Sequence, residues 1–202
     1  MHHTLIPIDS LNRIGKLKTT YRYSETAPGR KESVADHSWR VALLVSLYAD
    51  MLATPDEQSR ALRMALVHDI AEAVTGDIDH VKISDGIVTR EEKQAAEQRA
   101  FDELKKAFPK ETGESLEVLW TEYDKGITDV ARFVKALDKL ETMTQFVANG
   151  YTTYDRPELI PNYADKAVSD FPALAPVLNE IKSRLRKEYE TGGMEWKATY
   201  DI

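Results

Sequence analysis

The chain has 202 residues, with 27 Lys and Arg against 34 Asp and Glu, and so a formal net charge of −7. That length fits one domain, and 42% hydrophobic residues are enough for a folded core. Cysteine is absent, which excludes disulfides, a thiolate nucleophile and Cys-ligated zinc. The acidic balance argues against a nucleic-acid polymer as partner, because such binding depends on clustered Lys and Arg. No apolar run suits a membrane span, and the N-terminus lacks the pattern of a signal peptide, so we expect a cytoplasmic protein.

Helix start and stop signals recur along the chain, and strict apolar alternation is rare. Thr54 and Thr89 each stand three residues before a Glu, which is the pattern of a capping box. We predict helices near residues 9–18, 33–52, 54–76, 89–108, 116–124, 130–148 and 173–189. The segments 76–88 and 150–162 are rich in Gly, Pro, Asp and Asn and predict loops. The sequence therefore predicts one all-α domain over residues 1–202, with its core at about 5–190 and a loose C-terminal tail.

The predicted helix 54–76 carries His68, Asp69 and Glu72 on the same side as its apolar residues. Ionised groups are costly to bury, so such residues must be paired, protonated or bound to a cation. A simpler interpretation is also open, because His68 and Glu72 are four residues apart and could form a partly exposed ion pair.

His37 lies on the apolar stripe of its own predicted helix, and Asp138 lies at the edge of another such stripe. Taken alone, His37 could be a hydrogen-bonded core residue. Asp138 could equally be a surface partner of Lys135 or Lys139.

Together, His37, His68, Asp69 and Asp138 supply two imidazoles and two carboxylates from three predicted helices. Two nitrogen and two oxygen donors suit one divalent transition metal, namely Mn, Fe, Co, Ni or Zn. Adjacent residues on an ideal helix diverge by about 100°, so His68 and Asp69 must converge through side chains of different length.

Four ordered motifs resemble a known signature: SVADHS at residues 33–38, VHDIAE at 67–72, TGDI at 75–78 and ALDK at 136–139. They are similar to the H…HD…D pattern of the HD-domain metal-dependent phosphohydrolases, and most of all to the 5'-deoxynucleotidase-type branch. The resemblance covers about residues 5–165. It implies an all-α bundle of the HD type and one divalent metal held by four side chains, those of His37, His68, Asp69 and Asp138.

The resemblance also implies hydrolysis of a phosphate monoester, with Glu72 and Asp77 near the attacking water. The phosphate-binding Arg of the family has its best counterpart in Arg22, and Arg30 is the competing candidate. Tyr23 stands where the branch has a Trp after that Arg.

The leading hypothesis is a 5'-deoxynucleotidase that releases phosphate from deoxynucleoside 5'-monophosphates, a small-molecule substrate. The alternatives are hydrolysis of another phosphoester, such as a nucleotide pyrophosphate or cyclic nucleotide, and a sensor that binds metal or nucleotide without turnover. An exposed apolar helix face could support a homodimer. We expect His80 to be a surface loop residue, and we expect four aromatic residues to be in the core: Trp39, Tyr48, Trp120 and Phe133.

Overall fold

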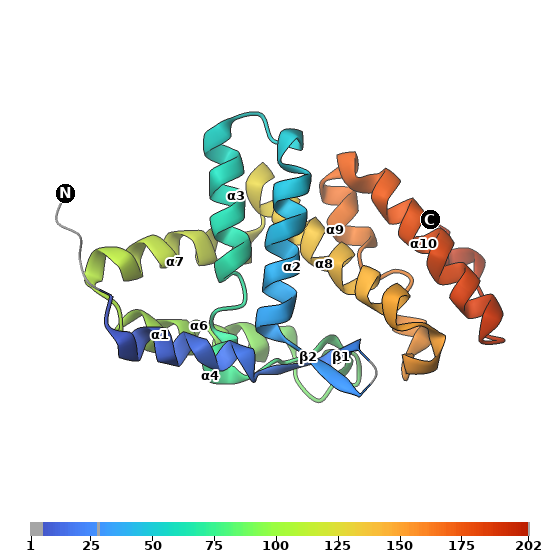
Figure 1. Ribbon diagram of the computed structural model, residues 1–202, viewed down its shortest axis with the longest axis horizontal. Coiled ribbons are helices and arrows are strands. Elements are labelled where there is room, and N and C mark those ends of the chain that lie inside the picture. Colours follow the sequence, from blue (N-terminus) through green and yellow to red (C-terminus); the bar gives the residue numbers. More distant parts are fainter. Residues whose placement is uncertain (1–5, 28, 202) are drawn as a thin grey trace.

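The computed structural model describes residues 6–27 and 29–201 and consists mainly of helices packed around a long central one (Figure 1). The helices are α1 (Ile8–Ile14), α2 (Val34–Leu47), α3 (Pro55–Val67), α4 (Glu72–Thr75), α5 (His80–Ser84), α6 (Arg90–Lys105), α7 (Lys110–Lys125), α8 (Asp129–Asn149), α9 (Asp165–Asp170) and α10 (Ala175–Thr191). The strands β1 (Tyr21–Ala27) and β2 (Arg30–Ser33) pair antiparallel. The predicted all-α class is confirmed, with this small hairpin added.

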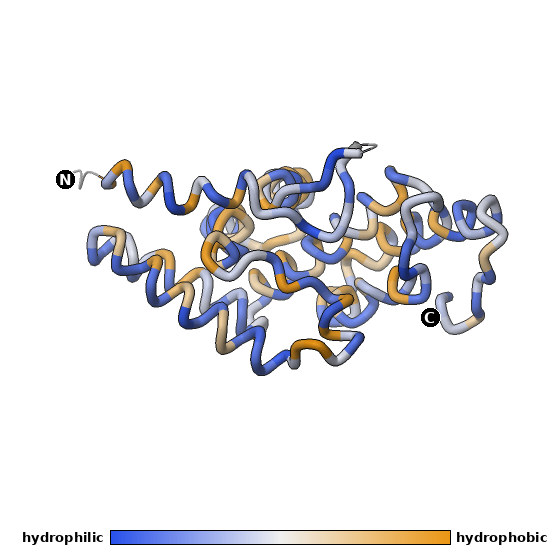
Figure 2. Tube along the Cα trace, turned by 90° about the horizontal axis from the view of Figure 1, so that it is seen from below, coloured by the Kyte–Doolittle hydropathy of each residue, from blue (hydrophilic) through white to orange (hydrophobic). Residues whose placement is uncertain are grey.

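Helix α8 holds the fold together. It packs against α2, α3, α7, α9, α10 and β1, and its apolar stripe is fully buried at Phe133, Leu137 and Leu140. Hydrophobic and hydrophilic residues are interspersed along the helices (Figure 2), as expected for amphipathic helices around one core. Because several elements meet on α8, a polar residue on its inner face lies at the centre of the molecule.

Local signals explain where α3 and α6 begin. The side chains of Thr54 and Thr89 each accept a hydrogen bond from the backbone N–H three residues later. The carboxylates of Glu57 and Glu92 in turn accept one from the backbone N–H of the cap, so both predicted capping boxes are confirmed. Every helix in the described part of the chain is too short or too polar to cross a membrane.

The structure differs from the expectations for Trp39 and for the C-terminal tail. Trp39 is 63% exposed and not in the core, because it lies on the outer face of α2, while Phe133 and Trp120 are buried as expected. The C-terminal residues, expected to be a loose tail, place Tyr200 and Trp196 against Tyr189 of α10. Aromatic contact area accounts for this packing.

Candidate active site

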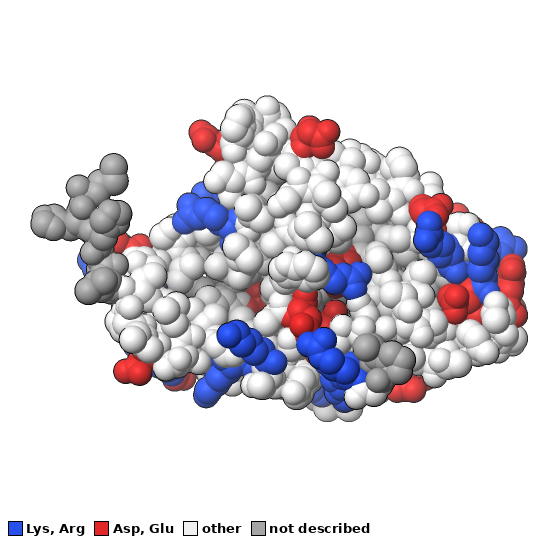
Figure 3. All heavy atoms as spheres, viewed as in Figure 1, with Lys and Arg blue, Asp and Glu red and all other residues white. Residues whose placement is uncertain are grey.

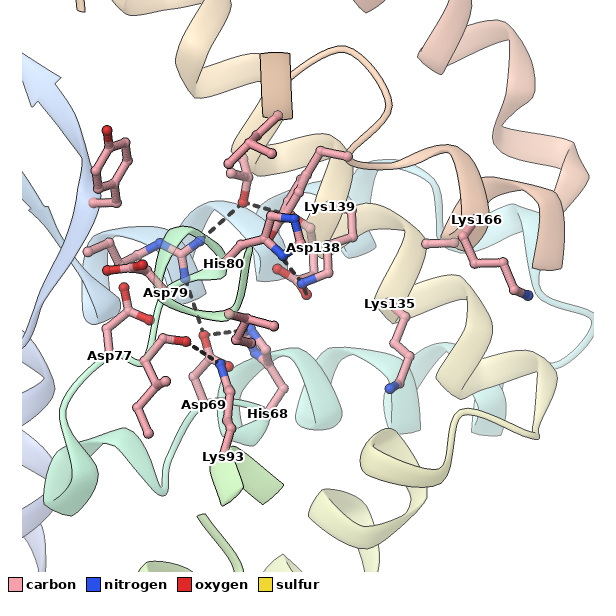
Figure 4. A pocket seen from close by; sticks show the side chains of 18 of the residues that line it. His68, Asp69, Asp77, Asp79, His80, Lys93, Lys135, Asp138, Lys139 and Lys166 are labelled. Carbon is pink, nitrogen blue, oxygen red and sulfur yellow. Dashed lines mark hydrogen bonds and ion pairs between the residues drawn. The ribbon is translucent and has the colours of Figure 1, made fainter. Parts of the chain in front are cut away.

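A cavity of about 850 Å³ opens beside α8 and is lined by residues of β1, the segment after α3, α5, α7 and α9. Figure 4 shows His68, Asp69 and Asp138 facing one another, with Asp77 and Asp79 on one side and Lys135 and Lys166 on the other. On the face seen in Figure 3, acidic atoms gather in a central hollow that Lys and Arg flank. The cavity therefore combines buried acids with positive charge at its walls.

A break in the predicted helix 54–76 lets adjacent residues converge. Helix α3 ends at Val67, and a tight turn follows in which Ile70 N–H bonds to Val67 O and Glu72 N–H bonds to Asp69 O. Both bonds span three residues, so the turn is tighter than an α-helix. His68 and Asp69 can then share one direction, which a continuous helix would not allow. The single predicted helix is wrong here because the turn replaces it.

His37 and His68 both use Nδ1, and not Nε2, for a hydrogen bond. Each Nδ1 has an acceptor: Glu141 Oε2 lies 2.5 Å from His37 Nδ1, and Ala65 O lies 2.8 Å from His68 Nδ1. Both Nε2 atoms are buried and make no hydrogen bond within the described part of the chain. A buried nitrogen lone pair without a partner is costly, so this orientation favours a ligand at Nε2.

Carboxylate oxygens surround the two Nε2 atoms. Asp138 Oδ1 lies 3.1 Å from His37 Nε2, and Asp69 Oδ2 lies 3.1 Å from His68 Nε2 and 3.8 Å from His37 Nε2. One ligand atom from each of His37, His68 and Asp69 falls within 4.8 Å of the others. This set of nitrogen and oxygen donors fits a divalent transition metal.

These contacts perturb the titration of the cluster. Burial and Arg22 lower the pKa of His37, but the adjacent carboxylates of Asp138 and Glu141 outweigh both and raise that pKa to about 9. Burial raises the pKa of Asp69, yet the neighbouring His68 ring lowers it below its ordinary value. The ionisation of one group in this cluster therefore changes the pKa of its neighbours.

Arg22 lies in the cavity wall, where β1 crosses α8. Its Nε is 3.2 Å from Glu32 Oε2, its Nη2 donates to Thr142 Oγ1 at 3.1 Å, and its Nη1 is 3.6 Å from Asp69 Oδ2. Arg30 is instead an exposed side chain paired with Asp36. Of the two candidates, only Arg22 is brought to the cluster.

Two further acids stand at the cavity. Glu72 is buried, and its Oε2 has no hydrogen-bond partner within the described residues. Burial, followed by the charges of Asp69 and Asp77, raises the pKa of Glu72 well above its ordinary value. Burial also raises the pKa of Asp77, against the opposing charge of Arg22. No ion pair joins Glu72 to His68 among the described residues, so the simple surface pair is not formed.

Other side chains surround the proposed ligands; the pairing of Lys139 with Asp138 was one of the open alternatives, whereas Tyr123 and Lys93 were not predicted from the sequence. Tyr123 donates to Asp138 Oδ2 at 2.6 Å, and Lys139 Nζ lies 3.0 Å from the same oxygen. Lys93, on α6, donates to Ile78 O at 2.8 Å and lies 4.0 Å from Glu72 Oε1. Lys139 is the one with a sequence signal, because it follows Asp138 directly.

His80 is exposed, as expected, but it begins a short helix and does not lie in a loop. It lines the cavity from α5 and contacts the ring of Tyr163 edge-on, with the ring centroids 5.4 Å apart. The predicted loop 76–88 contains α5, which begins at His80 after the capping residue Asp79. This short helix places the His80 ring at the cavity, against Tyr163 in the segment before α9.

Comparisons with known proteins give a consistent family. The profile of the HD domain matches residues 14–170. The chain is 29% identical to 5'-deoxynucleotidase HDDC2 of Mus musculus over 93% of this chain and 89% of that protein, and 31% identical to the Bos taurus protein of the same name over 87% and 81%. A crystal structure of a predicted metal-dependent phosphohydrolase from Magnetospirillum magnetotacticum superposes with a TM-score of 0.75 at 26% identity, covering 94% of this chain and 96% of that one.

The raised pKa of Glu72 predicts a stability cost in the metal-free protein. The unfolded chain ionises this residue near pH 4.5, whereas the folded chain resists ionisation, so stability should fall as the pH rises above 4.5. Glu72→Gln removes the charge and should raise the melting temperature, more at pH 8 than at pH 5. Each kcal/mol corresponds to roughly 2–4 °C at this chain length.

Thermal unfolding of the metal-free proteins at both pH values checks this, with the exposed Glu180→Gln as the matched control. If Glu72→Gln changed the melting temperature equally at the two pH values, the raised pKa of Glu72 in the folded protein would be contradicted.

Proposed function

Because the chain belongs to the HD-domain family, we propose that it is a metal-dependent phosphohydrolase that releases phosphate from deoxynucleoside 5'-monophosphates. The observation that carries this function is the pair of buried Nε2 atoms of His37 and His68, which make no hydrogen bond among the described residues and lie among carboxylates with Arg22 beside them. The relatives named 5'-deoxynucleotidase favour the deoxynucleotide among the phosphoesters.

We propose that His37, His68, Asp69 and Asp138 hold one divalent transition ion, either Mn, Fe, Co, Ni or Zn. Histidine nitrogen and carboxylate oxygen suit all five ions, so the donor set does not select among them. Such an ion supplies a hydroxide nucleophile near neutral pH and stabilises negative charge on the phosphoryl group. Tyr123 and Lys139 both hold Oδ2 of Asp138, which leaves Oδ1 directed to the cluster.

Arg22 is proposed to bind the substrate phosphate. Its guanidinium is fixed at Nε by Glu32 and at Nη2 by Thr142, so little side-chain entropy remains to be lost when a phosphate binds. A planar cation with two N–H groups can contact two phosphate oxygens at once. These contacts would orient the dianion at the cavity wall beside Asp69.

Glu72 is proposed to move the proton. Its raised pKa keeps a proton on the carboxyl at pH values where an ordinary Glu is ionised, which suits donation from Oε2 to the leaving 5'-oxygen. Asp77 is proposed to orient the attacking water from the loop between α4 and α5. Lys93 contacts both Glu72 and the backbone of Ile78 beside Asp77, so it connects these two acids. A sensor without turnover has no need for this second pair of acids.

A nucleotide panel tests the function. The metal-stripped protein, reloaded separately with each of the five ions, should release phosphate from deoxynucleoside 5'-monophosphates and should release none without metal. Turnover confined to cyclic nucleotides or nucleotide pyrophosphates would favour the alternative phosphoesters. Nucleotide binding without any turnover would favour the sensor.

The role of Glu72 is separable from metal binding. Glu72→Gln should keep one metal per chain and bind nucleotide, while kcat falls by roughly 100-fold or more, the scale of a lost general acid or base. Elemental analysis together with single-turnover kinetics measures both properties. Loss of metal would instead make Glu72 a ligand.

Arg22→Lys keeps the charge and loses the two-pronged geometry. We expect kcat/KM for the nucleotide to fall at least about 10-fold, the effect of one lost charge-assisted hydrogen bond, with metal content unchanged. Arg30→Lys is the matched control and should behave as wild type, because Arg30 is paired at the surface. The assignment is wrong if the two variants exchange these results.

We also propose a homodimer. Trp39, Leu43 and Leu47 recur every four residues on α2 and are 63%, 43% and 65% exposed, an apolar stripe of the kind that self-association buries. Light scattering should give twice the chain mass for wild type and the chain mass for Leu47→Glu. A wild-type monomer at micromolar concentration would contradict it.

A further inference from the structure

A buried carboxylate, Glu141, lies behind His37 on the side away from the cavity. It is 0% exposed and follows Asp138 by one turn of α8. Its Oε2 is 2.5 Å from His37 Nδ1. The proposed ligands do not include it, and it does not line the cavity.

The contact decides which nitrogen of His37 is free. An imidazole that donates its Nδ1–H to a carboxylate presents the lone pair of Nε2 on the opposite edge. We propose that Glu141 is a positioning residue that fixes His37 with Nε2 toward Asp69 and Asp138, so that the ring can bind a divalent metal. This inference rests on the metal site of the proposed function.

The two imidazoles are oriented by different means. His68 uses the backbone carbonyl of Ala65, which no side-chain substitution removes. His37 has no backbone acceptor at Nδ1 among the described contacts and depends on Glu141. A charged acceptor also raises the basicity of the ligating nitrogen, which a neutral carbonyl does to a smaller extent. A substitution of Glu141 should therefore release the ring of His37, whereas a substitution of Ala65 leaves the acceptor of His68 in place.

Glu141 is itself held in place. Arg40 Nε lies 3.1 Å from Glu141 Oε1 as an ion pair, and the same guanidinium donates to Gln145, one turn further along α8. Arg40 comes from α2, the helix that carries His37. Two residues of α2, His37 and Arg40, thus contact Glu141 of α8, and the second contact holds the carboxylate that orients the ring.

A second arrangement of the same residues is a separate cation site, because oxygens of Glu32 and Glu141 lie within 4.8 Å of a His37 nitrogen and of each other. Their existing contacts argue against it. Glu32 Oε2 accepts from Ser24 at 2.6 Å and from Arg22 Nε at 3.2 Å, and Arg40 compensates Glu141. The guanidinium groups of Arg22 and Arg40 already balance these two carboxylates. A positioning role for Glu141 predicts one bound metal per chain, whereas a second cation site predicts two.

Co²⁺ binding to the metal-stripped full chain tests the proposal, with competition against a chromogenic chelator to measure the Kd. Glu141→Gln keeps the size of the side chain but loses the charge. We expect it to bind one Co²⁺ per chain with a Kd raised roughly 10–100-fold, the usual effect of losing such an outer carboxylate, and with a changed visible Co²⁺ spectrum. Asp165→Asn is the matched control: it removes a carboxylate charge that is paired with Lys182 at 2.7 Å, outside the proposed metal site and the second cluster, and it should leave the Co²⁺ Kd close to wild type.

An unchanged Co²⁺ Kd in Glu141→Gln overturns the proposal, and so does a drop from two bound Co²⁺ to one, which would establish the second cation site. If Glu141→Gln does not fold, Arg40→Met releases Glu141 at a partly exposed position and should weaken Co²⁺ binding in the same direction. A wild-type Kd in Arg40→Met then overturns the proposal.

The readout is independent of turnover. Wild-type protein that binds one Co²⁺ tightly but hydrolyses no nucleotide would contradict the proposed function and leave the role of Glu141 standing. If the wild-type protein hydrolysed nucleotide and Glu141→Gln bound Co²⁺ as tightly as wild type, the proposed function would stand and the role of Glu141 would be contradicted.

Discussion

Carboxylates buried at the centre of a helical bundle need compensating positive charge, and this requirement governs the arrangement of the structure. Asp69 and Asp138 meet two imidazoles whose Nε2 atoms lack hydrogen bonds in the described part of the chain. Arg22 and Lys139 each reach one of these carboxylates from outside. The imidazole nitrogens and the carboxylate oxygens face one another at 3.1 Å, and this arrangement of donors supports the proposed divalent ion between them.

Helix α8 joins the two halves of the proposed chemistry. Within two turns it places Asp138 at the metal cluster, Glu141 behind His37 and Thr142 on the guanidinium of Arg22. The same helix carries the most deeply buried apolar stripe. Because core packing fixes the position of α8, the groups that would hold metal and phosphate keep a constant separation, as a pre-organised site requires.

Local signals in the sequence predicted much of this. The capping boxes at Thr54 and Thr89 are confirmed because a cap depends on residues only three apart. The four proposed ligands stood out as ionisable residues on or near apolar stripes, and the motif order tied them together. Their convergence in space agrees with that pattern, and their role as ligands stays a prediction.

The remaining features depend on contacts between distant parts of the chain. The hairpin that carries Arg22 owes its place to packing on α8, and the turn at His68 breaks a segment whose periodicity is helical. Lys93 reaches Glu72 from α6, across twenty-one positions of sequence. The outward position of Trp39 is equally invisible to periodicity, since its helix is apolar on more than one face. Tertiary packing determines each of these features, so local patterns in one sequence could not predict them.

The most direct test of the central claim is a crystal structure of the protein loaded with Mn²⁺ or Co²⁺, with the ion located by its anomalous scattering. The account predicts one ion with His37 Nε2, His68 Nε2 and oxygens of Asp69 and Asp138 at about 2.0–2.3 Å. An ion held by fewer than three of these four side chains, or one seated between Glu32 and Glu141, would contradict it.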